Sequence, residues 1–462
     1  MDQKNSDNIK IGIILVFGAN IINLIISLIN GFVLPKYLSV ETYAAIRTYY
    51  LYVSYTGILA LGYADGLFLK YGGRLMTDIP EKDINTARTN TLIMQSVMTL
   101  LCLFAGCLTG DWIFMIAAAT IIPSNITDVF KNIFQATGEF GIYSQVINYK
   151  PVLILIATLL LFVLRVENSL PYIVVIAIVS FIVWGLLEYK LYHLYKLRIG
   201  FHADANDLKE NIVSGLPLML GNFSDILVSS IDRWFVKILM STMSFALYSF
   251  AFSATSLISV FINPVAATMY NYMCNEADLK KISSIKNRCM ILALFLISAA
   301  YLAKLVLGVY LTKYYEAFRV LFILFSTEVF FMIIKGIYVN IYKAEKKQRL
   351  YFKQLLIVLL FSISANTVFY RVSGTIEAIA YATLLTSIFW YILCSLSVKG
   401  LKPNFRELTV LIAALLIFLL TGMHLSCIRG FCVYICAVTL LCITLMKEDF
   451  LRLSDVFISN KL

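Results

Sequence analysis

The stretch NFSDILVSSID, residues 222–232, sets polar side chains into a mostly apolar segment at intervals of three, four and three residues. These intervals place the four polar positions on one face of a helix. A shift of 202 residues aligns the stretch with NIINLIISLIN, residues 20–30, which is polar at the same four positions. The aligned polar residues are Asn222, Asp225, Ser229 and Asp232 in the later stretch, and Asn20, Asn23, Ser27 and Asn30 in the earlier one. This recurrence predicts that the chain consists of two homologous halves.

The composition around this stretch is that of a membrane protein. The 462 residues are 60% hydrophobic and 14% charged, with a mean hydropathy of +0.83, far outside the range of soluble domains. Nearly every apolar run has about 20 residues, the length of a helix that crosses roughly 30 Å of hydrocarbon, and none alternates with the period of a barrel strand. We predict an all-α polytopic membrane protein with fourteen transmembrane helices, at residues 11–34, 43–69, 87–108, 112–134, 146–164, 170–191, 212–238, 245–273, 289–311, 317–342, 350–370, 375–396, 408–424 and 430–446.

Lysine and arginine residues concentrate in alternate loops of this arrangement, and both termini fall on the basic side. By the positive-inside rule, both termini are predicted to be cytoplasmic. The net charge of +11 is explained by topology and by contact with anionic lipid headgroups, so we expect no nucleic acid as a partner. The nine cysteines and three histidines lack metal-ligand spacing, so we expect no metal and no cofactor.

Six helices in each half return the chain to the same side of the membrane, so the halves are expected to be parallel repeats. A shift of 208 residues also places NIFQA, residues 132–136, on NIYKA, residues 340–344. We predict an N-terminal lobe at 1–204, a C-terminal lobe at 205–398, and an extra helix pair with a cytoplasmic tail at 399–462. Such repeats are typical of transporters whose sites lie between the repeats, so a carrier is favoured over a channel or a receptor.

The repeated polar face has two interpretations. It can hold bundled helices together through hydrogen bonds between them, or it can line a water-filled cavity. Because four positions recur in both halves, we favour a cavity lined by the first and the seventh helix, and keep helix bundling as the alternative.

Ionisable residues inside the predicted helices are expensive in lipid, and they mark a pathway or a structural pair. Asp65 and Asp128 lie near cytoplasmic helix ends and are expected to be structural. Cations that border an aqueous cavity suit a polyanion such as a diphosphate, whereas carboxylates there can bind protons or Na⁺ and bias one conformation. We predict Arg47, Arg233, Lys304 and Lys335 as diphosphate-binding cations and Asp225 and Glu328 as ion-coupling carboxylates. A buried structural pair is the alternative for each of these charges.

Three segments carry a resemblance to a known family. The run LPKYLSVETYAAIRTYY (residues 34–50) precedes ILALGYADGLFLKYGG (residues 58–73), and the pair Asp232-Arg233 precedes FALYSFA (residues 245–251). Together with fourteen helices in two halves, these segments resemble the bacterial polysaccharide-unit flippases of the Wzx type. Ala44 and Ala246 depart from the pattern, because many relatives carry glycine there.

The resemblance implies a carrier of the multidrug/oligosaccharidyl-lipid/polysaccharide exporter (MOP) superfamily that is not an enzyme, uses no ATP and works by alternating access. Its substrate would be an undecaprenyl-diphosphate-linked oligosaccharide, moved from the cytoplasmic to the periplasmic leaflet of the inner membrane during O-antigen or capsule synthesis. The expected partners are this lipid, the surrounding membrane lipids, H⁺ or Na⁺ as the coupling ion and a polysaccharide polymerase, with the chain itself a monomer.

Other functions stay open at this point. The lipid II flippase and the multidrug extruders belong to the same superfamily, although extruders usually have twelve helices. A membrane glycan polymerase or glycosyltransferase, which is an enzyme, would need a large external loop with catalytic residues. The predicted external loops are only a few residues long, so an enzyme is disfavoured.

Overall fold

The computed structural model of the chain describes residues 18, 22–23, 25–258, 278–345, 347–398 and 400–453, except for the side chains of residues 30, 225, 256 and 348. Across these residues the secondary structure is helical, without a strand. Eleven of the helices are long and apolar enough to cross a membrane. The predicted all-α membrane fold is therefore confirmed. The count of fourteen stays a prediction, because the predicted runs 11–34 and 245–273 extend beyond the described residues.

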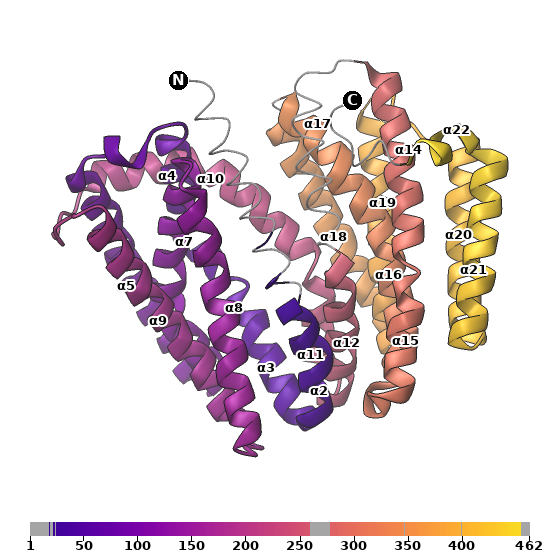
Figure 1. The fold of residues 1–462 in the computed structure, drawn as a ribbon, viewed down its shortest axis with the longest axis horizontal. Coiled ribbons are helices and arrows are strands. Elements are labelled where there is room, and N and C mark those ends of the chain that lie inside the picture. Colours follow the sequence, from indigo (N-terminus) through magenta and orange to yellow (C-terminus); the bar gives the residue numbers. More distant parts are fainter. Residues whose placement is uncertain are drawn as a thin grey trace. The chain divides into compact units, whose positions relative to one another are not determined.

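The chain divides into two compact units, Met1–Ile226 and Leu227–Leu462. The predicted lobe boundaries at 204/205 and 398/399 stay predictions. The first unit, coloured indigo to magenta in Figure 1, contains the π-helical turn η1 (Ile29–Val33) and the helices α2 (Leu34–Tyr37), α3 (Val40–Val53), η2 (Thr56–Ala60), α4 (Tyr63–Tyr71), η3 (Met76–Asp78), α5 (Glu81–Thr109), α6 (Trp112–Ala119), α7 (Ile121–Ala136), α8 (Phe140–Val163), α9 (Ser169–Leu194) and all but the end of α10 (Ala205–Val228).

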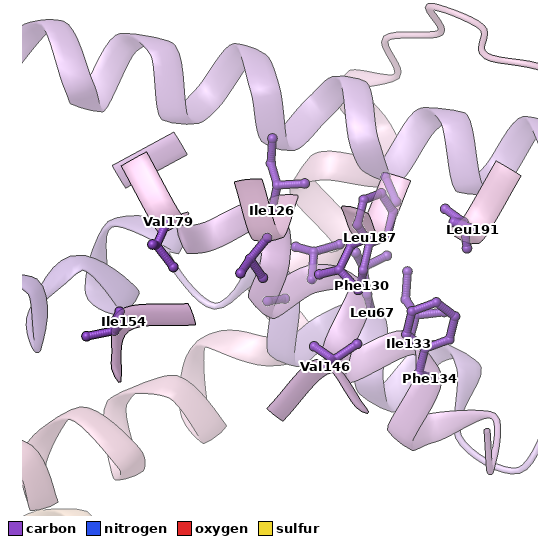
Figure 2. Close-up of a cluster of buried hydrophobic side chains, with 14 of the residues drawn as sticks. Leu67, Ile126, Phe130, Ile133, Phe134, Val146, Ile154, Val179, Leu187 and Leu191 are labelled. Atoms are coloured by element: carbon purple, nitrogen blue, oxygen red, sulfur yellow. The ribbon is translucent and has the colours of Figure 1, made fainter. Parts of the chain in front are cut away.

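The core of the first unit forms around α7. Phe130, Ile133 and Phe134 of this helix are buried together with Leu67 of α4 and Leu187 of α9, and Figure 2 shows these five side chains within one cluster. Lipid tails are as apolar as leucine, so inside a membrane such a cluster gains stability from close van der Waals packing rather than from exclusion of water.

The predicted helix at 43–69 is wrong as a single helix, because the chain breaks between α3 and α4. Leu61 and Gly62 adopt left-handed backbone conformations, with φ of 50° and 82°, and the turn η2 precedes them. The Gln95 side chain donates to the Leu59 carbonyl at 3.1 Å, and Asn125 donates to the Thr56 carbonyl at 3.1 Å. These bonds satisfy backbone oxygens that the break removes from the helix, which lipid could not do.

Glycines let α4 and α10 cross with their backbones in contact. A Cβ atom on Gly66 would lie 2.0 Å from the carbonyl oxygen of Asn211, and one on Gly215 would lie 2.1 Å from the carbonyl oxygen of Gly62. Only residues without a side chain permit this approach. The crossing therefore fixes the first half of α10 within the first unit.

The second unit, coloured from magenta to yellow in Figure 1, is also built from helices. Its described elements are α11 (Ile231–Leu239), α12 (Thr242–Thr255), η4 (Ser256–Ile258), α14 (Leu279–Leu296), α15 (Ala299–Val309), η5 (Thr312–Tyr314), α16 (Ala317–Ile333), the π-helical turn η6 (Ile334–Tyr338), α17 (Val339–Ala344), α18 (Gln348–Ser373), α19 (Ile376–Ser397), α20 (Phe405–His424), α21 (Cys427–Leu445) and α22 (Lys447–Leu451).

Two pairs of elements occupy matching positions in the two alignments. The helices α3 and α12 each have 14 residues, begin 202 residues apart and are each followed by a short 3₁₀ turn. The helices α7 and α17 end at Ala136 and Ala344, which the second alignment pairs. The local structure thus repeats where the sequence repeats.

Candidate functional site

The polar face of residues 222–232 does not lie on one continuous helix, as the spacing predicted. The helix α10 ends at Val228 and α11 begins at Ile231, because Ser230 leaves the helical conformation with φ −133° and ψ −5°. Asn222 is exposed, Ser229 is half-buried and Asp232 is buried. The side chain of Asp225 lies outside the described part of the chain, so its predicted coupling role stays a prediction.

The earlier polar stretch is described only in part. Asn20 lies outside the described residues, as does the side chain of Asn30, whose backbone is in η1. Asn23 is half-buried and Ser27 is exposed. The predicted cavity lining by this stretch stays a prediction.

Asp232 joins three helices of the second unit. Its side chain is 2% exposed, and its Oδ2 accepts hydrogen bonds from the Tyr248 hydroxyl of α12 at 2.6 Å and the Thr383 hydroxyl of α19 at 3.2 Å. Its Oδ1 accepts the backbone N–H of Arg233 at 2.7 Å, in the first turn of α11. A carboxylate at a helix N-terminus is favoured by the helix dipole, which explains why a new helix starts here.

The chemistry of this cluster allows ion binding. A buried carboxylate with hydroxyl oxygens around it can exchange a proton, and oxygen ligands of this kind also suit a hard cation. Arg233 directs its guanidinium to the Phe252 ring, with 3.9 Å between Cζ and the ring centroid. We call Asp232, Tyr248 and Thr383 the Asp232 cluster. Protonation of the Asp232 carboxylate would weaken the hydrogen bonds that it accepts from the Tyr248 and Thr383 hydroxyls.

Glu328 and Lys335 lie on one accessible strip of the second unit. Between residues 320 and 342, only Glu328, Phe331 and Lys335 keep partly exposed side chains, and every other residue is buried. The Lys335 ammonium lies 5.5 Å from the centroid of the Phe331 ring. Lys335 also lies in the π-helical turn η6, and such turns are frequent at functional sites. An acid and a base therefore lie on the same partly exposed face of this helical segment.

Arg47 is half-buried in α3 of the first unit. Its guanidinium lies over the Tyr43 ring, with 4.8 Å between Cζ and the ring centroid, and its buried Nε makes no hydrogen bond. Among the residues that the structure describes, no carboxylate pairs with Arg47. Arg47 thus combines a permanent charge with unused hydrogen-bonding capacity.

Lys304 has a different environment from the other predicted cations. It is 5% exposed, and its ammonium donates to the carbonyls of Gly422 at 2.6 Å and Leu425 at 2.9 Å. These carbonyls end α20, where a cation is favoured by the helix dipole. The ammonium is therefore used within the second unit, which favours a structural role for Lys304 over the predicted binding of a diphosphate.

Sequence reasoning missed Tyr248 and Thr383. They lie 16 and 151 residues beyond Asp232, and each sits in a helix rich in similar side chains. Tyr248 lies within the FALYSFA segment, but no local pattern marks Tyr248 or Thr383 as a partner of Asp232, because the contact is created by the packing of α11, α12 and α19.

Comparison with solved structures shows which known proteins share the fold of this chain. No family model and no curated protein matches the chain. Solved structures do match: the lipid II flippase MurJ in an inward closed conformation has a TM-score of 0.59 at 14% identity and covers 91% of this chain and 98% of its own. An inward-facing MATE-family multidrug transporter of the MOP superfamily has a TM-score of 0.63 at 15% identity, over 84% of this chain and 98% of its own. An outward-facing MATE-family multidrug transporter of that superfamily has a TM-score of 0.52 at 15% identity, and the match covers 88% of this chain and 95% of that transporter. The chain is a multi-pass membrane protein with the fold of MOP-superfamily transporters.

Proposed function

We propose that the chain is a flippase that carries an undecaprenyl-diphosphate-linked oligosaccharide from the cytoplasmic to the periplasmic leaflet of the bacterial inner membrane. The product would serve the synthesis of a surface polysaccharide such as O-antigen or capsule. The fold shared with the lipid II flippase and the Wzx-type segments of the sequence support this proposal. The protein acts by binding and conformational change, without covalent chemistry.

The observation that carries the proposal is the environment of Arg47. A charged side chain inside a membrane protein is costly unless it is paired or hydrogen-bonded. Among the described residues, Arg47 has an aromatic ring on one side and no carboxylate. A diphosphate offers the paired oxygens that a guanidinium binds with two parallel hydrogen bonds. Substrate binding would therefore supply a counter-charge that the described residues do not.

Lys335 and Arg233 are the further cations of this proposal. Lys335 belongs to the accessible strip of the second unit, and Arg233 directly follows Asp232. Both have aromatic rings beside their charges, which lowers the cost of desolvation before the anion arrives. Each is a candidate phosphate-binding cation within the second unit.

Ion coupling is assigned to carboxylates of the second unit. The Asp232 cluster joins α11, α12 and α19 through one carboxylate, so protonation or Na⁺ binding there would change how these helices hold together. Glu328 is the second candidate because it lies on the accessible strip. An ion that binds one conformation more tightly shifts the equilibrium towards it. The identity of the ion stays open between H⁺ and Na⁺.

A multidrug extruder is the second candidate function. The match to the inward-facing MATE transporter, with a TM-score of 0.63, is compatible with it. The flippase match covers 91% of this chain against 84% for that transporter, which favours the longer flippase architecture. A lipid II flippase is also compatible, since it would use the same diphosphate.

The proposal also includes the membrane topology, the oligomeric state and a partner protein. Both termini would be cytoplasmic, the chain would act as a monomer, and a polysaccharide polymerase would use the delivered lipid on the periplasmic side. These three points rest on the distribution of basic residues and on the resemblance.

The test is deletion of the gene. We expect undecaprenyl-linked saccharides to accumulate on the cytoplasmic face of the membrane and the surface polysaccharide to disappear. Drug sensitivity with a normal surface polysaccharide would instead support the extruder. Accumulated lipid II with arrested cell-wall synthesis would support the lipid II flippase.

A further inference from the structure

The helix α7 has two chemically different faces. One face is apolar and carries Ile126, Phe130, Ile133 and Phe134 into the core of the first unit, as Figure 2 shows. Between Ser124 and Gln135, the opposite face carries mostly polar residues. This α7 polar face consists of Ser124, Thr127, Asp128, Lys131, Asn132 and Gln135.

The α7 polar face is accessible. Gln135 is exposed and the other five residues are half-buried, although the Ser124 hydroxyl oxygen itself is buried and the Asn132 amide donates to the Ala64 carbonyl at 3.3 Å. Asp128 and Lys131 form an ion pair at 2.5 Å, yet their side chains keep 45% and 33% of their exposure. The helix nevertheless belongs to an apolar segment, Trp112–Ala136, that is long enough to cross a membrane. Six polar side chains on one face would be costly against lipid, so lipid is an unfavourable neighbour for this face.

The charges beside the α7 polar face cancel. Asp65 of α4 and Lys150 of α8 both interact electrostatically with the ion pair of Asp128 and Lys131. Two acids and two bases leave no net charge, so this surface has no general preference for a diphosphate. It does offer hydroxyl and amide groups, which both donate and accept hydrogen bonds, and a carboxylate, which accepts them. These are the groups that recognise a neutral molecule rich in hydroxyls.

We propose that the α7 polar face binds the saccharide part of the transported lipid, while Arg47 binds its diphosphate. This inference rests on the proposed function and adds to it a site for the neutral, polyhydroxylated head group. It also changes the role of Asp128, which the sequence indicated as structural. The residues of this face determine which head group is carried, rather than whether an anionic lipid is bound.

The test compares two lipids on the purified full chain in lipid nanodiscs. The probes are undecaprenyl diphosphate and undecaprenyl-diphospho-N-acetylglucosamine, and the measurement is the ratio of their Kd values. We expect the wild-type protein to bind the saccharide lipid more tightly. In Thr127→Ala/Gln135→Ala the ratio should fall towards one, because each lost hydrogen bond changes Kd by roughly fivefold. This variant leaves the ion pair of Asp128 and Lys131 intact, and Asp128→Asn tests the charged part of the face.

The controls separate this inference from the proposed function. Arg47→Ala should weaken both lipids alike and leave the ratio unchanged. Ser364→Ala should change neither value, since the Ser364 hydroxyl is exposed on α18 and bonds to the Leu360 carbonyl of its own helix. Equal binding of both lipids by the wild type, or an unchanged ratio in the α7 variants, would overturn the saccharide site alone. Failure of the wild type to bind either lipid would overturn the proposed function as well.

Discussion

The Tyr248 hydroxyl donates a 2.6 Å hydrogen bond to the carboxylate of Asp232, and both residues are buried in the second unit. Thr383 donates to the same oxygen from a third helix. A carboxylate that accepts these bonds holds α11, α12 and α19 in register. Neutralising it removes part of that attraction, because hydrogen bonds to a charged acceptor are about twice as strong as neutral ones. The cluster therefore connects the ionisation of one group to the packing of three helices.

The first prediction concerns Asp232→Asn. The amide keeps the volume but removes the ionisation, so transport should lose its dependence on an imposed proton or Na⁺ gradient while the protein still folds. Tyr248→Phe should weaken this dependence without abolishing it, because Thr383 and the Arg233 N–H still bond to the carboxylate. Transport by vesicles under imposed gradients measures both. Gradient-dependent transport by Asp232→Asn equal to that of the wild type would refute this coupling role.

The second prediction concerns Arg47. We expect Arg47→Ala to lower the transport rate by about tenfold or more, since a lost charge-assisted hydrogen bond is worth roughly 1.5–3 kcal/mol. Arg47→Lys should retain only part of the activity, because an ammonium lacks the two-pronged geometry of a guanidinium. Arg74→Ala is the matched control, as Arg74 is exposed in a loop of the same unit. If Arg47→Ala and Arg74→Ala transport equally well, the anion site is misplaced.

The third prediction concerns the crossing of α4 and α10. A methyl group at Gly66 would collide with the backbone of Asn211 at 2.0 Å, so Gly66→Ala should sharply reduce the yield of folded protein. Gly185→Ala is the control, because a Cβ atom there meets nothing within 4 Å and alanine raises helix propensity. The yield of monodisperse protein after gel filtration measures the difference. Equal yields for the two variants would show that the crossing is looser than described.

The fourth prediction concerns the ion pair of Lys286 and Glu407, which joins α14 to α20. Their side chains are 2.8 Å apart and only 2% and 4% exposed. Lys286→Met alone should destabilise the protein by about 3–5 kcal/mol, because it leaves a buried charge without a partner. Lys286→Met/Glu407→Leu should recover most of that loss. Thermal unfolding in detergent tests this, and a double variant no more stable than the worse single variant would contradict it.

Much of the fold was predictable, because the length and hydropathy of an apolar run are enough to predict a membrane helix. The eleven long helices of the described residues correspond to predicted runs, and the pairing of α3 with α12 follows from the alignment of residues 40–53 with 242–255. The α7 polar face was also readable, since its residues follow helical spacing. It was not predicted as a binding face, because the recurrence of polar positions in both halves pointed to residues 20–30 and 222–232 instead.

The rest depends on tertiary structure. The break after Val228 has a local signal, because serines followed by an aspartate favour a helix start, but hydropathy alone runs through it. The acceptors of Lys304 lie 118 and 121 residues away, so its role at the end of α20 could not be read from its own segment. The position of a charged residue along a predicted helix therefore indicated that it avoids lipid. It did not indicate whether the charge is used within the protein or is available to a ligand.

The most direct measurement of the central claim is transbilayer movement of a fluorescent undecaprenyl-diphosphate-linked oligosaccharide in vesicles that contain the purified protein. The account predicts movement faster than in protein-free vesicles, slowed by about tenfold or more in Arg47→Ala and unchanged in Arg74→Ala. Movement in the protein-containing vesicles no faster than in protein-free ones, under either a proton or a Na⁺ gradient, would contradict the claim that this chain is a lipid-linked oligosaccharide flippase.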